Sequence, residues 1–250
     1  MSNIWIQCAG DSNAREQRLE PWRVVESQHQ VSTRKLVDSD AEQQLLEQLI
    51  EGAKPPERTR GRLHYLLFTP FRYPPLRYGS RFGPRSEPGI WYGSETLRTA
   101  FAEVAYYRLL FLAGTAVDLG LLQTELTAFR AAVRTTRGID LTDDPFAEYE
   151  SVLASPVSYS QTQALGTAMR AAGIEAFRYR SARDVERGVN VGVIIPGAFG
   201  RRAPRNLETW HCTATRELIE LVRRDYFARA SFDFRREEFL VGGVLPSPAT

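Results

Sequence analysis

The chain has few of the residues from which metal centres and disulfide frameworks are built. Its 250 residues include two cysteines, Cys8 and Cys212, and three histidines. No CxxC or HxxxH spacing accompanies the neighbouring pair His211 and Cys212. Because a zinc site needs three or four clustered ligands, we expect no metal. The low cysteine content fits the cytosol, where disulfides are rare.

Long apolar runs are also missing. The longest extends from Leu109 to Val117, nine residues, whereas a helix that spans a bilayer needs about 20. The first residues lack the basic region and apolar stretch of a secretory signal. We therefore expect neither a transmembrane helix nor a secretion signal, which favours a cytoplasmic location.

An excess of one charge is absent too. The 32 basic and 30 acidic residues give a net charge of +2, so the whole chain has no electrostatic basis for binding DNA or a membrane. Lysine is nearly absent, since Lys35 and Lys54 are the only two. Arginine carries almost all the positive charge, and its fixed fork of donors suits phosphates and carboxylates.

The common catalytic motifs are missing as well: there is no GxGxxG, Walker loop, GxSxG or HExxH. What remains is a globular composition, with 43% hydrophobic and 25% charged residues. A stretch rich in charge, proline and glycine at residues 53–62 has the character of a linker. We expect a partly helical N-terminal extension over 1–60 and one main domain over 61–250.

Hydrophobic periodicity predicts a mixture of helices and strands. Helices are expected at 41–50, at 95–112 with Ser94 as the cap, at 145–153, and at 160–172 with Gly173 as the C-terminal cap. Strands are expected at 63–69, 89–92, 124–135, 174–179 and 189–195. Residues 210–224 have features of both helix and strand, and residues 227–241 alternate as in a strand that closes a sheet. Because strands and helices do not alternate regularly, the pattern favours an α+β fold.

One of these helices carries an isolated acidic residue. Between Phe101 and Ala113 the only charged residues are Glu103 and Arg108, and the helix is apolar on nearly all sides. Such a helix is expected to be largely buried. Glu103 has no basic residue three or four positions away, so its carboxylate needs a distant partner or a chemical task. Two interpretations stay open: a functional carboxylate, or a helix-edge residue that is solvated or paired with a distant arginine.

The loop between residues 71 and 92 is rich in arginine and aromatic side chains. Its arginines are Arg72, Arg77, Arg81 and Arg85, and its first aromatic residues are Phe71, Tyr73, Tyr78 and Phe82. Guanidinium groups bind phosphates and flat rings stack on bases, so this composition suits a dinucleotide. The alternative is a solvated loop whose arginines point into water.

Two polar residues stand at strand ends further along the chain. Ser181 follows the strand expected at 174–179, and Asn190 begins the next one. Each side chain is either a ligand-binding group or a residue that satisfies a turn, and both interpretations stay open.

Taken together, these segments resemble the RES domain family. The motifs, in order, are Ser80-Arg-Phe-Gly83, Gly89-Ile-Trp-Tyr-Gly-Ser94, Thr99-Ala-Phe-Ala-Glu103-Val, Arg180-Ser-Ala and Gly188-Val-Asn190-Val. The resemblance covers about residues 60–245 and depends on the order and spacing of several short motifs.

This resemblance implies a fold, an activity and a partner. The fold is ADP-ribosyltransferase-like, with mixed β-sheets, flanking helices and a cleft that binds NAD. RES proteins are typically toxins of bacterial toxin–antitoxin pairs, and the antitoxin has an Xre-type helix-turn-helix and a C-terminal toxin-binding region. They consume NAD as a substrate and release nicotinamide without a metal. The ADP-ribosyl group then passes to water, to inorganic phosphate or to a protein.

The resemblance also assigns roles to four residues. Arg81, Tyr92, Glu103 and Ser181 take the positions of the family's arginine, tyrosine, glutamate and serine. Glu103 would stabilise the positive charge that develops on the ribose as its bond to nicotinamide breaks. Tyr92 would stack on the nicotinamide ring, Arg81 would bind the pyrophosphate, and Ser181 would fix the nicotinamide ribose or amide.

The chain departs from the family pattern at the arginine. The family's usual Gly-Arg-Trp-Asn is Ser-Arg-Phe-Gly around Arg81. Arg77 and Arg85 therefore stay open as alternatives, and Arg77 and Asn190 join the expected NAD-binding residues. An alternative function on the same scaffold is a non-catalytic module that binds a nucleotide or a partner. Residues 1–60 carry too few basic residues to predict an arm that binds DNA.

Overall fold

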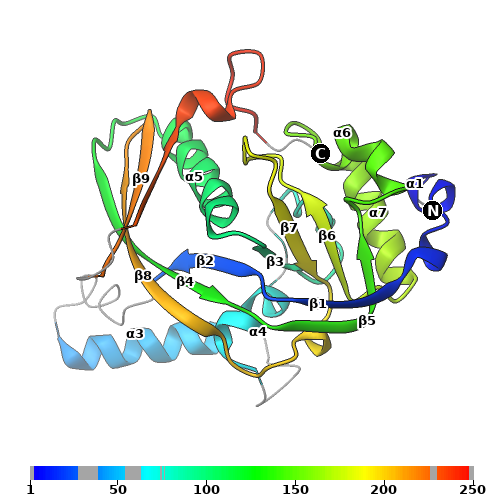
Figure 1. The fold of residues 1–250 in the computed structure, drawn as a ribbon. Helices are drawn as coiled ribbons and strands as arrows, with labels where there is room; N and C mark the ends of the chain where they lie inside the picture. The colour runs from blue at the N-terminus through cyan, green and yellow to red at the C-terminus, as the bar shows by residue number, and fades with distance from the viewer. Residues whose placement is uncertain are drawn as a thin grey trace.

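The structure is a computed structural model that describes residues 3–27, 39–53, 63–73, 75, 77–225 and 230–247 (Figure 1). It is an α+β fold, as predicted, with one large sheet and helices packed against it. The strands are β1 (Arg15–Leu19), β2 (Trp22–Glu26), β3 (Trp91–Ser94), β4 (Leu122–Arg130), β5 (Val133–Asp140), β6 (Ala176–Arg180), β7 (Val189–Val193), β8 (Arg205–Ala214), β9 (Leu218–Arg223) and β10 (Ser231–Arg235). The α-helices are α1 (Asn3–Gln7), α3 (Asp40–Ala53), α4 (Tyr65–Arg72), α5 (Leu97–Gly114), α6 (Glu150–Leu153) and α7 (Ser160–Ala171).

The described strands form one ten-stranded sheet in the order β1-β5-β6-β7-β3-β2-β4-β8-β9-β10. Strands β5 and β6 are parallel, and the other neighbours are antiparallel. The middle of the sheet is β2, because Trp22 pairs with Ser94 of β3 on one side and with Arg130 of β4 on the other. A strand from the start of the chain thus joins the two halves of the sheet.

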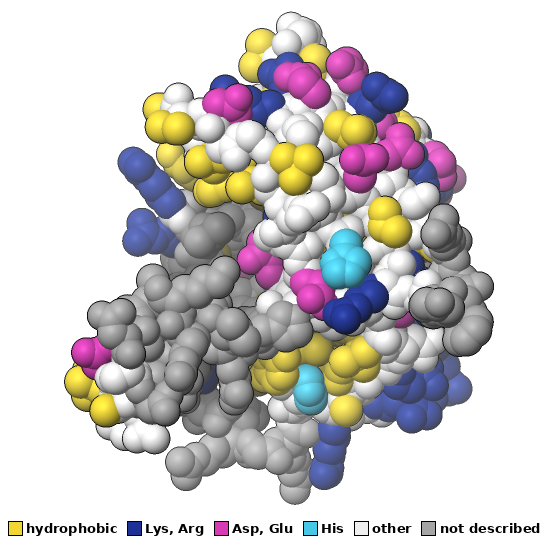
Figure 2. Space-filling model, turned by 90° about the vertical axis from the view of Figure 1, so that its left-hand side faces the viewer, with side chains coloured by type: hydrophobic (Ala, Val, Ile, Leu, Met, Phe, Trp, Pro, Cys, Tyr) yellow, Lys and Arg dark blue, Asp and Glu magenta, His cyan; other side chains and the backbone are white. Residues whose placement is uncertain are grey.

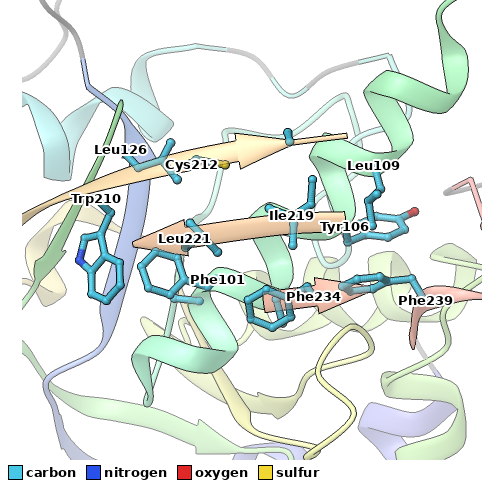
Figure 3. Close-up of a cluster of buried hydrophobic side chains, with 14 of the residues drawn as sticks. Phe101, Tyr106, Leu109, Leu126, Trp210, Cys212, Ile219, Leu221, Phe234 and Phe239 are labelled. Carbon is cyan, nitrogen blue, oxygen red and sulfur yellow. The ribbon is translucent and has the colours of Figure 1, made fainter. Parts of the chain in front are cut away.

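Helix α5 packs on the half formed by β2, β4, β8, β9 and β10 (Figure 3). Its Phe101 ring meets the Trp210 ring edge-on, with the ring centroids 4.7 Å apart. Tyr106 and Leu109 continue the same buried face toward Phe239. Full burial of one such side chain contributes about 1.5–3 kcal/mol relative to exposure. The helix is therefore held firmly on the sheet, and any functional group on its other face has a fixed position.

Two further clusters complete the core. Helices α6 and α7 pack with β5 and β6 through Leu153, Leu165 and Phe177. Helix α4 covers the opposite face of the sheet centre, where Leu67 lies in one cluster with Trp91 of β3. Both faces of the central strands are consequently buried.

The predicted strand at 63–69 is wrong. This segment begins α4, where the His64 side chain accepts a hydrogen bond from Leu66 N at 3.3 Å and caps the helix. Pro70, expected in the following loop, lies inside α4. A short apolar run does not distinguish a buried strand from a buried helix.

Other predicted boundaries also change. Ser94 ends β3, and the cap of α5 is Thr96, whose Oγ1 accepts a hydrogen bond from Thr99 N at 3.1 Å. The strand expected at 124–135 is two strands, β4 and β5, separated by Ala131 and Ala132. The segment 210–224, which had features of both helix and strand, contains the end of β8 and all of β9. Strand β10 is the expected strand that closes the sheet at its edge. Residues 227–229 of that prediction lie outside the described residues.

Several predicted elements are confirmed. The helix at 41–50 is α3, the helix at 160–172 is α7, and Gly173 follows it with a φ of +71°. The strands at 174–179 and 189–195 are β6 and β7. Most of the linker expected at 53–62 lies outside the described residues. The boundary at residue 60 stays a prediction, although β1 and β2, which precede it, belong to the same sheet as the rest.

Candidate active site

A cavity of about 600 Å³ lies beside α5 at the centre of the sheet. Ligand sites in proteins occupy about 300–1,000 Å³, so the cavity has the size of a binding site. Its walls come from α5, β2, β3 and β4, together with Arg81, Tyr159 and Tyr179. Glu103 and Asn190 lie in these walls, and so does Tyr92.

The Glu103 carboxylate finds its partners on distant elements. Its Oε1 accepts a hydrogen bond from Ser181 Oγ at 2.7 Å and another from Asn190 Nδ2 at 2.6 Å. Both donors are neutral, and both bind the same oxygen. The two hydrogen bonds thereby fix the direction of the carboxylate, and within the described residues Oε2 forms no hydrogen bond.

Ser181 combines the two roles that the sequence left open. Its Oγ accepts hydrogen bonds from Arg183 N at 3.0 Å and Asp184 N at 3.1 Å, as in a turn. A hydroxyl has two lone pairs and one proton. Because both lone pairs are taken by backbone donors, the proton is directed to Glu103.

Asn190 is oriented by its neighbour across the sheet. It pairs with Ser94 in the register of β3 and β7, and its Oδ1 accepts a hydrogen bond from Ser94 Oγ at 2.6 Å. The amide nitrogen therefore faces Glu103. Ser94, expected to cap the helix, instead fixes a residue that binds the carboxylate.

Tyr92 is anchored through its hydroxyl group. The oxygen accepts a hydrogen bond from Phe82 N at 3.2 Å and lies 2.9 Å from Ser80 Oγ. Burial raises the pKa of Tyr92 to about 12, so the phenol is neutral at physiological pH. Its ring lies against Tyr179, with the ring centroids 6.3 Å apart. The hydroxyl group therefore holds the ring in place in the wall of the cavity.

Arg81 is buried and fixed in the cavity wall. Its Nη1 donates to Ser155 O at 2.7 Å and to Leu153 O at 3.3 Å, and its guanidinium stacks over the Tyr159 ring at 4.7 Å. Stacking and carbonyl contacts hold the cation without a carboxylate to neutralise it in these contacts. The positive charge is thus available to an anion in the cavity.

The other two arginines considered at this position lie elsewhere. Arg77 is exposed and stacks over Tyr78 at 5.4 Å, and Arg85 is exposed as well. Neither residue lines the cavity. The structure therefore brings Arg81, Tyr92 and Asn190 into the wall of the cavity with Glu103, and leaves the two exposed arginines apart. Ser181 contacts Glu103 but does not itself line the cavity.

Sequence reasoning missed a buried aspartate that supports this arrangement. Asp184 accepts hydrogen bonds from Thr99 Oγ1 at 2.8 Å and Arg98 Nη1 at 3.2 Å, while its backbone N–H binds Ser181. Thr99 lies four residues before Glu103 on α5. Asp184 thereby ties the start of α5 to the turn that contains Ser181. An aspartate three residues after a serine at a strand end is a signal for such a turn.

A family model described as RES domain matches residues 55–215. No curated protein matches the chain. The matched region contains Arg81, Tyr92, Glu103, Ser181 and Asn190, but it does not include β1, β2, β9 or β10.

Within the part of the chain that the structure describes, no group of three or more His, Cys, Asp and Glu side chains is placed to hold a metal ion. No helix in the same residues has both the length and the apolar character needed to cross a bilayer.

Proposed function

The chain belongs to the RES domain family, whose members are NAD-related domains associated with toxin–antitoxin systems, and from this premise we propose that it cleaves NAD⁺. In the proposed reaction the cavity beside α5 binds NAD⁺, and the bond between nicotinamide and ribose is broken. The protein is then the toxin of a bacterial pair, and an Xre-type antitoxin with a C-terminal toxin-binding region neutralises it.

The observation that carries this proposal is the Glu103 carboxylate held by two neutral donors. When the nicotinamide–ribose bond breaks, its electron pair moves to the nicotinamide nitrogen and the sugar becomes cationic. A preorganised negative charge in a site shielded from water stabilises such a cation. Because Ser181 and Asn190 fix Oε1 and Glu103 lines the cavity, the carboxylate needs little reorganisation during the reaction.

Two other residues support dinucleotide binding. The Arg81 guanidinium, held by Ser155 O and stacked on Tyr159, supplies positive charge for the pyrophosphate through Nε and Nη2. The Tyr92 ring, anchored at its hydroxyl, supplies a flat surface for nicotinamide. Ser181 acts on the substrate through Glu103, since its proton and both lone pairs are already used.

The reaction is completed when an acceptor oxygen or nitrogen bonds to the ribose carbon that nicotinamide has left. Water gives ADP-ribose and inorganic phosphate gives a phosphorylated ADP-ribose, whereas a protein nucleophile becomes ADP-ribosylated. In each case the acceptor releases a proton as the new bond forms. Mass spectrometry of small molecules and proteins after incubation with NAD⁺ identifies the acceptor.

The first prediction tests the carboxylate. Glu103→Gln keeps the size of the side chain and removes its charge. Loss of one preorganised electrostatic group costs roughly 10²–10³-fold in turnover, while NAD⁺ binding changes little because the ground-state sugar carries little charge at that carbon. Nicotinamide release and NAD⁺ affinity of the folded variant, with thermal unfolding as the control, measure the effect.

Near-normal turnover of Glu103→Gln would remove Glu103 from the chemistry. Binding of NAD⁺ by the wild-type protein without nicotinamide release, with or without phosphate or cell extract, would instead favour the non-catalytic module. In cells, expression of the wild-type chain alone should arrest bacterial growth, and expression of Glu103→Gln should not. Co-expression of the helix-turn-helix partner should restore growth.

A further inference from the structure

Two separate segments hold the charged groups of the candidate site. Glu103 is held by Ser181, in the turn that follows β6. Arg81 is held by Ser155 O, in the segment 154–159 between α6 and α7. A carboxylate and a cation that act on one substrate molecule must keep a fixed separation, because small displacements reduce the rate strongly. A residue that joins the turn to the segment 154–159 would fix that separation.

Arg183 makes this connection. Its backbone N–H donates to Ser181 Oγ at 3.0 Å, and its side-chain Nη2 donates to Pro156 O at 2.9 Å. The neighbouring carbonyl oxygen, Ser155 O, accepts a hydrogen bond from Arg81 at 2.7 Å. Because Ser155 and Pro156 are consecutive, two adjacent carbonyl oxygens receive the two guanidinium groups. One residue thus links the two segments.

Helix α5 fixes the Arg183 guanidinium from another side. The Cζ atom lies 3.6 Å from the centroid of the Tyr106 ring, and an aromatic face attracts a cation. Tyr106 is fully buried, and its hydroxyl donates to Pro246 O, so the ring is held in place. Tyr106 lies three residues after Glu103 on the same helix. Arg183 therefore also joins the Ser181 turn to the helix that carries the carboxylate.

The surroundings of Arg183 are unusual for an arginine of this chain. On the face shown in Figure 2, Lys and Arg side chains lie at the surface, several of them beside acidic ones. Among the described residues only two arginines are buried, Arg81 and Arg183, and Arg183 is 4% exposed. Within the same residues its side chain contacts a carbonyl oxygen and a ring, and it forms no salt bridge. A buried cation without a carboxylate costs free energy, so stability alone does not explain an arginine here.

We propose that Arg183 is a positioning residue that sets the separation between Glu103 and Arg81. Arg81 lines the cavity and Arg183 does not, so Arg183 acts on a substrate only through the groups that it holds. Its backbone and side chain together join the Ser181 turn, α5 and the segment 154–159. This proposal rests on the proposed function and deepens it, because it names the residue that keeps the two charged groups in one arrangement.

The test replaces Arg183 by residues that keep either its approximate volume or its charge. Arg183→Met removes the donor and the charge. Replacement of a buried charge by an apolar group of similar volume is often neutral for stability, so the variant should unfold at about the wild-type temperature. Its kcat for nicotinamide release should nevertheless fall roughly tenfold to hundredfold. Arg183→Lys, which keeps a cation over the Tyr106 ring, should stay within roughly threefold of the wild-type kcat.

Arg216→Met is the matched control. Arg216 also donates to backbone carbonyl oxygens, those of Thr115 and Val117. Its side chain is 42% exposed, and it does not line the cavity. The kcat of this variant should equal that of the wild type.

Hydrogen exchange reports the connection without any turnover. Backbone amides in the segment 154–159 and in the turn 181–184 should exchange faster in Arg183→Met than in the wild type, because a local opening needs less free energy once the link is lost. Both segments should change together. In Arg216→Met both should exchange as in the wild type.

Wild-type kcat and wild-type exchange in Arg183→Met would overturn the proposal. A lower unfolding temperature with unchanged kcat would also overturn it, since Arg183 would then serve stability alone. If Arg183→Met does not fold, Arg183→Gln, which keeps an amide donor and loses the charge, takes its place with the same expected fall in kcat. If the wild-type protein releases no nicotinamide, the proposed function fails, and the exchange measurement still decides whether Arg183 joins the two segments.

Discussion

At the scale of single residues, the direction of each hydrogen bond around Glu103 is fixed by its neighbour. Ser94 takes the acceptor oxygen of Asn190, and backbone N–H groups take the lone pairs of Ser181, so that both residues present donors to the carboxylate. The carboxylate is therefore held by two donors whose own hydrogen bonds prevent them from turning away. The position and ionisation of the Glu103 carboxylate should therefore be sensitive to any substitution that replaces one of these hydrogen-bond donors by an acceptor.

Asn190→Asp makes that change with almost no change in shape. The new carboxylate still accepts from Ser94, and its second oxygen then faces Glu103 Oε1, where the amide nitrogen now lies at 2.6 Å. Two carboxylates at this distance share a proton, so the pKa of the pair rises. We expect nicotinamide release at pH 7 to fall roughly 10²-fold, and the pH–rate profile to shift to higher pH. A profile identical to that of the wild type would exclude this coupling.

The sequence could predict that the Glu103 carboxylate needs a partner, but it could not predict which residues supply the hydrogen bonds. An apolar helix with one carboxylate and no local cation indicates that Glu103 needs a distant partner, and the structure supplies two. Their identity depends on the register in which Ser94 meets Asn190, which no local pattern specifies. The family resemblance proposed Ser181, and the geometry places it beside Glu103 as a donor.

At the scale of elements, α7 approaches the segment that contains Arg81 very closely. A Cβ on Gly166 of α7 would lie well under 3.0 Å from the carbonyl oxygen of Phe82, closer than real Cβ atoms come to backbone. Thr162, on the same helix, donates from Oγ1 to Arg81 O at 2.5 Å. The helix thus sets the position of residues 81 and 82, and through them the Tyr92 hydroxyl.

Gly166→Ala should therefore destabilise the protein although alanine favours helices. We expect the free energy of unfolding to fall by about 1–3 kcal/mol, as for other overpacked core positions. Gly114→Ala is the matched control, because a Cβ there meets nothing within 4 Å, and its stability should be unchanged or slightly higher. Urea unfolding of both variants measures the difference. Equal stability of the two variants would contradict the close approach.

Elements were predictable where the hydrophobic periodicity was clear, as in α3 and α7. They were not predictable where burial on both sides removes the periodicity. The apolar run at residues 63–69 is a helix that packs under the sheet. Strand β1, with the polar sequence Arg-Glu-Gln-Arg-Leu, belongs to a sheet edge and pairs with β5. Pairing with a distant strand, rather than hydrophobic alternation, makes it a strand.

At the scale of the whole molecule, several tyrosines in the cavity wall and on α5 are hard to ionise. Burial raises the pKa of Tyr92 and Tyr106 to about 12 and raises the pKa of Tyr179 as well. Burial also raises the pKa of both cysteine thiols. Burial lowers the pKa of Arg23 to about 10, which has the opposite effect on how the stability of the protein depends on pH. The protonated tyrosines and thiols outnumber this one arginine.

The free energy of unfolding should consequently fall as the pH rises from about 10 towards 12. In this range the folded protein holds protons that the unfolded chain has lost, so rising pH favours the unfolded state. Urea unfolding at about pH 8 and about pH 11 measures the loss, and Tyr92→Phe should make it smaller. Stability that stays level across this interval would show that the tyrosines are not protected from ionisation.

The central position of β2 has a consequence for the order in which the protein assembles. Residues 22–26 leave the ribosome early, yet they pair with residues 126–130, and such distant pairing is slow to form. The two donors to Glu103 come later still, at residues 181 and 190. A nascent chain therefore carries the carboxylate long before it carries the groups that orient it. The proposed toxicity begins only when synthesis has passed these residues and β2 has closed the middle of the sheet.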